Sequence, residues 1–103
     1  MPAILRLTTG VVYARSISGT LTFSSGAVAA FADGTEAAPS ITNDGDTNTG
    51  IRFSAADTMD FVTAGADRWQ ISSAGHLLAV DDNTYDIGAS GATRPRDFYL
   101  ARN

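Results

Sequence analysis

The stretch Asp57–Gly75, DTMDFVTAGADRWQISSAG, decides the fold of this chain. Met59 and Phe61 stand two apart before a Thr-Ala-Gly-Ala turn, and Trp69 and Ile71 stand two apart after it. Side chains two apart on a strand share one face, so each run offers one apolar pair to a core. Glycine supplies the backbone freedom that a tight reversal needs. We therefore expect two antiparallel strands here, with their large apolar side chains on one side.

The same pattern of apolar pairs, separated by small and polar residues, continues on both sides of this stretch. Short strands at about 8–12-residue spacing with turn signals between them are typical of all-β folds. The runs are shorter than an ordinary strand of about 5–6 residues. The sequence therefore predicts an all-β protein built from short antiparallel strands. The further pairs are Ile51/Phe53, Leu78/Val80, Tyr85/Ile87 and Phe98/Leu100.

The side chains of this protein are unusually small. Ala, Thr, Gly and Ser make up nearly half of the 103 residues, and the larger apolar residues are spread evenly along the chain. A chain with so few bulky apolar groups buries little surface by itself. We therefore expect neighbouring copies to complete the core, so that the folded unit is an oligomer.

Charge and composition exclude several classes of function. Seven arginines and no lysine stand against eleven acidic residues, and the net charge is −4. Nucleic-acid binding requires a clustered basic patch, so we expect no nucleic-acid partner. The longest apolar run, Ala27–Ala32, is far shorter than the ~20 residues of a membrane span, so we expect no membrane partner. The chain has no cysteine and therefore forms no disulfide or thiolate metal site.

Residues 1–32 differ from the rest because Arg6 and Arg15 are their only charges. Their strand-like apolar runs, which include Leu21 and Phe23, are either ordinary strands of the same core or an arm that docks on another protein. We expect Thr35–Ser40 to be a linker and place a boundary between Asp33 and Pro39, which gives an N-terminal anchoring arm (1–38) and a β knob (39–103). The expected anchoring residues are Leu5, Leu7, Val12, Tyr13 and Ile17.

The most polar stretch is Asn43–Gly50, NDGDTNTG. Asp44, Asp46 and Asn48 have the spacing of the first ligands of a calcium loop, but Ala55 stands where that loop needs a glutamate. Asx residues with glycine also form plain polar turns by capping their own backbone amides. We expect the turn and no metal, with a structural cation as the alternative.

Residues 38–77, APSITNDGDTNTGIRFSAADTMDFVTAGADRWQISSAGHL, resemble a segment of bacteriophage tail-fibre and related virion appendage proteins. The end, YDIGASGATRPRDFYL (85–100), is similar to the fibre motif Asp-Leu/Ile-Gly, several small residues, then Arg-aromatic-Arg-Asp/Asn-Leu-Tyr-Leu. Pro95 replaces the usual aromatic residue of that motif, Phe98 replaces its leucine, and His76 stands where the family usually has asparagine. The resemblance covers about residues 39–100. The matching positions of the end motif are Asp86, Ile87, Gly88, Arg94, Arg96, Asp97, Tyr99 and Leu100.

This resemblance implies a parallel, intertwined homotrimer with a structural or adhesive role at the virion surface. At 103 residues the chain is short for a self-sufficient tail fibre. We therefore expect a capsid decoration, cement or head-fibre protein whose N-terminal arm binds the major capsid protein or another virion protein. The alternative is a short tail fibre or receptor-binding tip whose loops Asp81–Thr84 or Ala89–Thr93 touch a host glycan or protein. The expected trimer core is Ile51, Phe53, Met59, Phe61, Trp69, Ile71, Leu78, Val80, Ile87, Phe98 and Leu100.

No catalytic constellation stands out, so we expect neither enzymatic activity nor a cofactor. The chain has one histidine, His76, and no Gly-x-Ser-x-Gly elbow. Two acidic pairs have the composition of a glycosidase site, but we expect solvated surface acids: Asp57 with Asp60, and Asp81 with Asp82. We also expect a surface position for His76, in preference to three histidines around a metal on a threefold axis. Finally, we expect an ion pair between Asp86 and Arg94 or Arg96.

Overall fold

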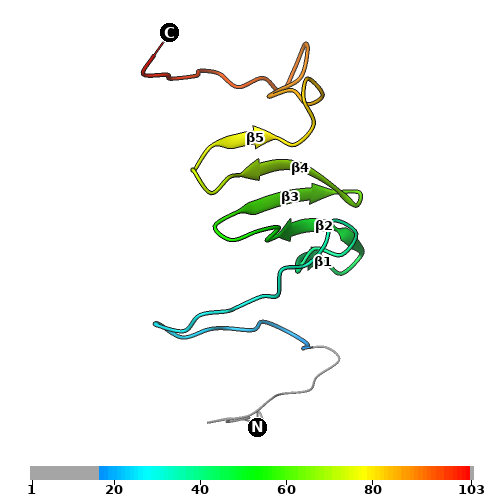
Figure 1. Ribbon diagram of the computed structural model, residues 1–103. Coiled ribbons are helices and arrows are strands. Elements are labelled where there is room, and N and C mark those ends of the chain that lie inside the picture. Colours follow the sequence, from blue (N-terminus) through cyan, green and yellow to red (C-terminus); the bar gives the residue numbers. More distant parts are fainter. Residues whose placement is uncertain (1–16, 103) are drawn as a thin grey trace.

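Five strands form one antiparallel sheet in the computed structural model, which describes residues 17–102 (Figure 1). Each strand pairs with the next strand in the sequence, so the sheet is a simple meander. The described residues contain no helix, and the all-β prediction is confirmed for them. The strands are β1 (Ile41–Asn43), β2 (Asp46–Arg52), β3 (Met59–Thr63), β4 (Ala66–Ile71) and β5 (Leu77–Ala79).

The turns form where glycine and Asx residues predict them. Between β3 and β4, Ala64 and Gly65 both have positive φ angles, 52° and 73°. Positive φ at both central residues is the geometry of a type I′ turn, whose twist matches that of the flanking strands. Between β1 and β2, the Gly45 amide donates a hydrogen bond of 2.8 Å to the Asn43 side-chain oxygen, which confirms the predicted Asx turn.

The strand register places the large apolar side chains on one face, as the alternation predicts. Phe61 at the centre of β3 pairs with Ile51 on one side and with Trp69 on the other. Met59 pairs with Ile71. Directly opposed residues point to the same side of a sheet, so these residues form one continuous apolar face.

A bulge in β4 changes which residues share a face. The register runs from Phe61–Trp69 to Val62–Asp67, which leaves Arg68 as an extra residue of β4. An extra residue reverses the alternation on its own strand. As a result Asp67 lies on the face of Val62, although it stands two residues from Trp69 on the apolar face.

Residues 33–40 are part of the folded unit. The Phe53 amide donates a hydrogen bond of 2.8 Å to the Asp33 carbonyl, and Pro39 is buried. Thr35 and Ala38 exchange backbone hydrogen bonds of 3.0 and 3.2 Å, so the expected linker is a tight turn. This turn carries Glu36 to the Asp67 side of the sheet, opposite the apolar face.

The described residues outside the sheet extend away from it at both ends (Figure 1). The Cα radius of gyration is 18.5 Å, whereas a compact chain of this length has about 13 Å. No strand forms at Leu21–Phe23, and the expected pairs Tyr85/Ile87 and Phe98/Leu100 are not in strands either. An apolar pair forms a strand only beside another strand that takes up its backbone hydrogen bonds, and the described residues of this chain offer none there.

Candidate functional site

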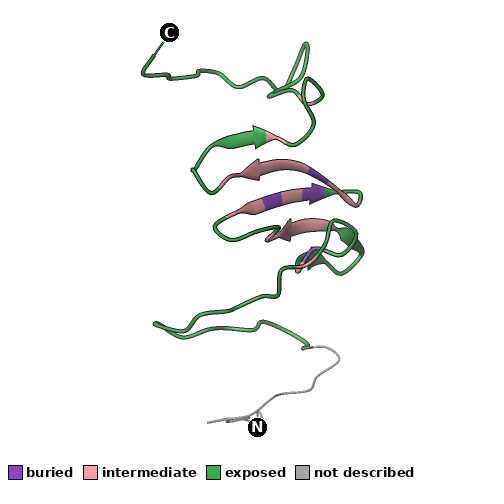
Figure 2. Ribbon diagram, in the orientation of Figure 1, coloured by how far each residue is buried: buried purple, intermediate pink, exposed green. Residues whose placement is uncertain are grey.

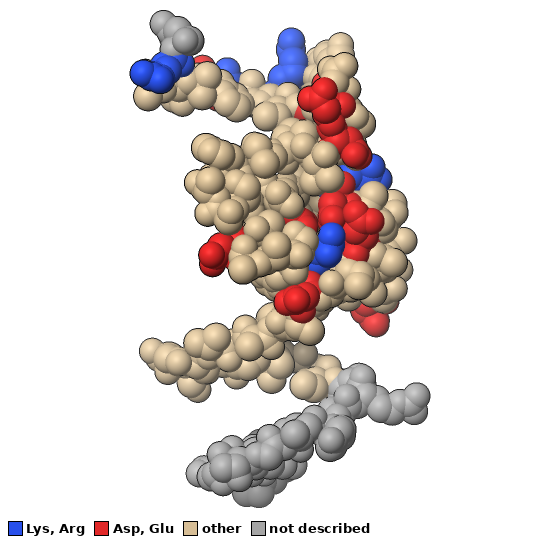
Figure 3. Space-filling view, viewed as in Figure 1, with Lys and Arg blue, Asp and Glu red and all other residues tan. Residues whose placement is uncertain are grey.

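The other described residues cover the apolar face of the sheet only in part. Its central residues are half-buried, and Val62 on the opposite face, at 2% exposure, is the one buried hydrophobic residue other than Pro39 between residues 17 and 102. Burial is limited to short stretches of the sheet and its adjoining turn, and β5 and both ends are mostly exposed (Figure 2). Most of the acidic side chains visible in this view gather along one side, beside a broad surface with few charges (Figure 3).

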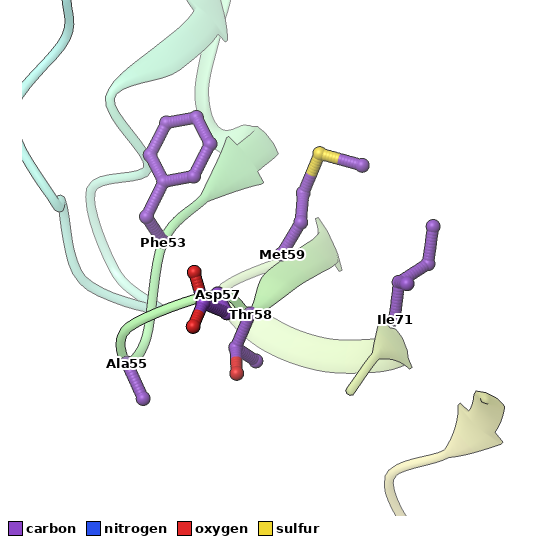
Figure 4. Close-up of a pocket in the computed structure, with 6 residues that line it drawn as sticks. All are labelled: Phe53, Ala55, Asp57, Thr58, Met59 and Ile71. Carbon is purple, nitrogen blue, oxygen red and sulfur yellow. The ribbon is translucent and has the colours of Figure 1, made fainter. Parts of the chain in front are cut away.

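Two hollows lie on this face. The first, of about 340 Å³, is lined by residues at the ends of β2, β3 and β4 and by the loop between β2 and β3. Phe53, Met59 and Ile71 extend from neighbouring strands in the same direction around it (Figure 4). The second, of about 550 Å³, lies between β3, β4 and the loop after β5; its lining is Phe61, Thr63, Arg68, Trp69, Thr84, Tyr85, Asp86 and Gly88. Apolar hollows of this size accept side chains of a partner.

Tyr85 holds the wall of the second hollow in place. Its hydroxyl donates a hydrogen bond of 2.9 Å to Asp81 Oδ2 and accepts one of 3.1 Å from Arg68 Nη1. Its ring lies 6.3 Å from that of Trp69, and the Arg68 guanidinium carbon is 5.5 Å from its centre. Arg68 also donates to Thr63 Oγ1 at 2.9 Å. The bulge residue Arg68 therefore connects the sheet to the loop 81–86.

A cluster of charges lies on the other face of the sheet. Arg52 binds Asp67 with two hydrogen bonds, Nε to Oδ1 at 2.9 Å and Nη2 to Oδ2 at 2.6 Å. Asp60, which pairs with Arg52 across β2 and β3, is completely buried, and its Oδ2 is 3.8 Å from Arg52 Nε. Neither carboxylate oxygen of Asp60 has a hydrogen-bond partner among the described residues. Burying a charge costs free energy unless an opposite charge compensates it. Arg52 is the residue that offsets this cost for both Asp60 and Asp67.

The pKa of Asp67 lies below its usual value, mainly because it accepts the hydrogen bonds of Arg52. Burial opposes this shift, while the positive charge of Arg52 adds to it. The pKa of Arg52 is raised in turn, first by its hydrogen bond to Asp67. The pair is a structural clamp between β2 and β4 across β3.

We expect the lowered pKa of Asp67 to make stability depend on pH in the acid range. A carboxylate with a depressed folded pKa contributes stability above its unfolded pKa, which is about 3.9, and loses it as the pH falls through the folded value. The urea midpoint should therefore fall as the pH decreases from 5 to 2. In Asp67→Asn, which carries no proton-linked charge at this position, the fall should be smaller. An equal fall in both proteins at one concentration would contradict the prediction.

The structure brings together only some of the residues predicted for the core. Those from β2 to β4 share the apolar face: Ile51, Phe53, Met59, Phe61, Trp69 and Ile71. Leu78 pairs with Gln70 and lies on the opposite face of the sheet. Its two neighbours, Leu77 and Ala79, pair with Ile71 and Trp69 and continue the apolar face. Val80 follows the end of β5, and the remaining three predicted core residues are exposed outside the sheet: Ile87, Phe98 and Leu100.

Of the expected anchoring residues, Ile17 is exposed, and the other four lie outside the described residues: Leu5, Leu7, Val12 and Tyr13. The described part of the arm exposes further large apolar side chains, and none of its residues from 17 to 32 is charged. They are Leu21, Phe23, Val28 and Phe31.

Two expectations about polar residues are wrong, and one ion pair of the sheet was not expected. Asp60, expected at the solvated surface, is completely buried beside Arg52. In the described residues Asp86 forms no ion pair with Arg94 or Arg96; instead Arg96 contacts Asp97 at 3.5 Å on the exposed surface. The clamp of Arg52 and Asp67 was not predicted from the sequence.

The residues considered from the sequence as possible metal ligands do not form a cluster. Asp44 stands in the turn after β1 while Asp46 and Asn48 belong to β2, and His76 is exposed in the turn before β5. Between residues 17 and 102, no three acidic or histidine side chains converge in a way that could bind a metal ion. The same part of the chain holds no helix that would reach across a bilayer.

Comparison with known proteins gives no relative for this chain: no protein-family model, no curated protein and no solved structure matches it.

Proposed function

We propose that this chain is a structural phage virion protein: a homotrimeric capsid decoration, cement or head-fibre protein that acts without enzymatic activity at the virion surface. The observation that carries the proposal is the uncovered apolar face of a sheet whose opposite face is covered by charges and by the turn 33–40. A single copy leaves its largest side chains half-exposed. Association of copies through this face would give the fold the core that one chain lacks.

The N-terminal arm supplies the second part of the proposal. Residues 17–32 extend away from the sheet and carry exposed apolar side chains without a single charge (Figure 1). Such a segment suits docking on another protein, here the major capsid protein or another virion protein. Three arms on one trimer would raise the effective concentration at the particle, so that no single contact needs to be tight.

Binding to particles assembled without the protein tests this proposal. Leu21→Asp/Phe23→Asp should reduce the bound protein at least tenfold while the sedimentation coefficient of the free oligomer stays unchanged, and deletion of residues 1–30 should do the same. Ser24→Asp/Ser25→Asp adds the same charge to the same exposed segment and should bind nearly as well as the original protein. Full binding by the first variant and the deletion would overturn the anchoring role.

The alternative function, a receptor-binding tip, makes a different prediction in the same system. The loop Asp81–Thr84 is exposed and is held in place by Tyr85. If substitutions of Asp82 and Asn83 abolish adsorption of the particle to its host while the protein remains on the particle, the receptor-binding function is the correct one.

A further inference from the structure

The C-terminal segment 96–102 carries large apolar side chains that the rest of the chain does not cover. Phe98, Tyr99 and Leu100 are 65%, 89% and 70% exposed. The segment runs away from the sheet without pairing to any strand of the described chain (Figure 1). In an extended backbone Phe98 and Leu100 point to one side and Tyr99 to the other. Two apolar groups on one side of an exposed segment are suited to a surface on another molecule.

The second hollow offers such a surface. Its floor is aromatic, from Phe61 and Trp69, and Tyr85 forms its wall. Its charge also complements that of the segment. Three acids in or beside the hollow outnumber the one cation that lines it, Arg68: they are Asp81, Asp82 and Asp86. In the C-terminal segment and its root three arginines outnumber the one acid, Asp97: they are Arg94, Arg96 and Arg102.

The segment of the same chain does not fill this hollow. Gly88, with a φ angle of 89°, lines the hollow, and a Cβ atom at this position would lie 2.6 Å from Pro95 Cδ. Gly88 and Pro95 therefore lie close together, so the residues between them form a closed loop that separates the hollow from the C-terminal segment. No residue of 96–102 lines the hollow, and the C-terminal end of the chain lies apart from the sheet (Figure 1).

We propose that Phe98 and Leu100 of one copy occupy the hollow beside Trp69 of a neighbouring copy, so that the oligomer is held by exchange of C-terminal segments. This inference rests on the proposed oligomer and names the surfaces that meet in it. Each copy gives one segment and receives one, and the arginines of the segment face the acidic loop 81–86 of its neighbour. The exchange covers the exposed apolar groups of the segment and part of the open sheet face at once.

Photo-crosslinking identifies the occupant directly. Sedimentation velocity first establishes the oligomer of the unmodified chain. Phe98→p-benzoylphenylalanine, which keeps an aromatic group at this position, is then prepared with ¹⁵N and with ¹⁴N, and the two forms are unfolded, mixed and refolded together. Irradiation should join position 98 to the peptide of Trp69 or Tyr85, and half of the crosslinked pairs should contain one heavy and one light chain. Pairs of uniform isotope content, or crosslinks only to other peptides, would overturn the exchange.

Trp69 is the single tryptophan of the chain and reports on the same contact. Phe98→Ser/Leu100→Ser should increase the acrylamide quenching constant of Trp69 at least twofold, because the hollow is then open to solvent. Tyr99→Ser, on the other side of the segment, should leave quenching unchanged. If quenching is the same in all three proteins, the exchange is wrong while the oligomer stands. A monomeric unmodified chain would overturn both the exchange and the proposed oligomer.

Discussion

Phe61→Asp should convert the proposed oligomer into folded monomers. Phe61 lies at the centre of the apolar face between Ile51 and Trp69. A carboxylate at the centre of an association surface loses its hydration without gaining a partner, and symmetry would bring several such charges together. We expect the dissociation constant to rise at least a thousandfold, which corresponds to about 4 kcal/mol. Sedimentation equilibrium over a range of protein concentrations measures this change.

Ser73→Asp is the matched control for this prediction, because it adds the same charge at an exposed residue of the turn between β4 and β5. Its dissociation constant should change less than threefold. Circular dichroism separates dissociation from unfolding, since Phe61 is only half-buried in the single chain and its replacement should leave the β signal in place. An oligomer of unchanged mass in Phe61→Asp would show that the apolar face is not the association surface.

Arg52→Met should destabilise the fold by about 3 kcal/mol. Arg52 is the cation next to two buried acids, Asp60 and Asp67, and its own side chain is only 19% exposed. Removing one partner of a buried ion pair leaves the other charge uncompensated, which costs about 3–5 kcal/mol. Methionine keeps most of the side-chain volume, so the loss reports mainly on charge. Urea unfolding at one protein concentration gives the free energy.

Two further variants make this prediction specific. Arg96→Met removes an arginine that is 97% exposed in the single chain and contacts only Asp97 there. Even where it faces the acidic loop of a neighbouring copy it forms an exposed ion pair, so we expect its effect to be below about 1 kcal/mol. Asp67→Asn added to Arg52→Met removes one of the uncompensated charges and should recover part of the lost stability. If Arg52→Met were as stable as the original chain, the charge cluster would not be the clamp that holds β2, β3 and β4 together.

The middle of the sheet was predictable because two local signals agree there. Met59 and Phe61, then Trp69 and Ile71, alternate with polar or smaller residues, and a glycine turn separates the two runs. Local agreement between alternation and turn chemistry fixes the register of a hairpin. The apolar face of β2, β3 and β4 follows from these signals alone.

The charge cluster was not predictable in the same way, because it depends on one extra residue. Strict alternation places Asp67 on the same face as Trp69, and no residue around Arg68 signals the bulge that moves it to the other face. The burial of Asp60 follows from this geometry, since Asp67 and the turn that carries Glu36 cover its side of the sheet. The strands predicted at the exposed pairs outside the sheet do not form, because alternation leads to a strand only where a neighbouring strand exists.

The order of the strands has a consequence for how fast the sheet forms. Every pairing joins strands that are consecutive in the chain, and the paired positions are mostly about ten residues apart. Such short loops close at little entropic cost, and proteins with local contacts fold quickly. Each hairpin can form as soon as its second strand leaves the ribosome, so we expect the slow step in forming the proposed oligomer to be the encounter between finished chains, whose rate increases with their concentration.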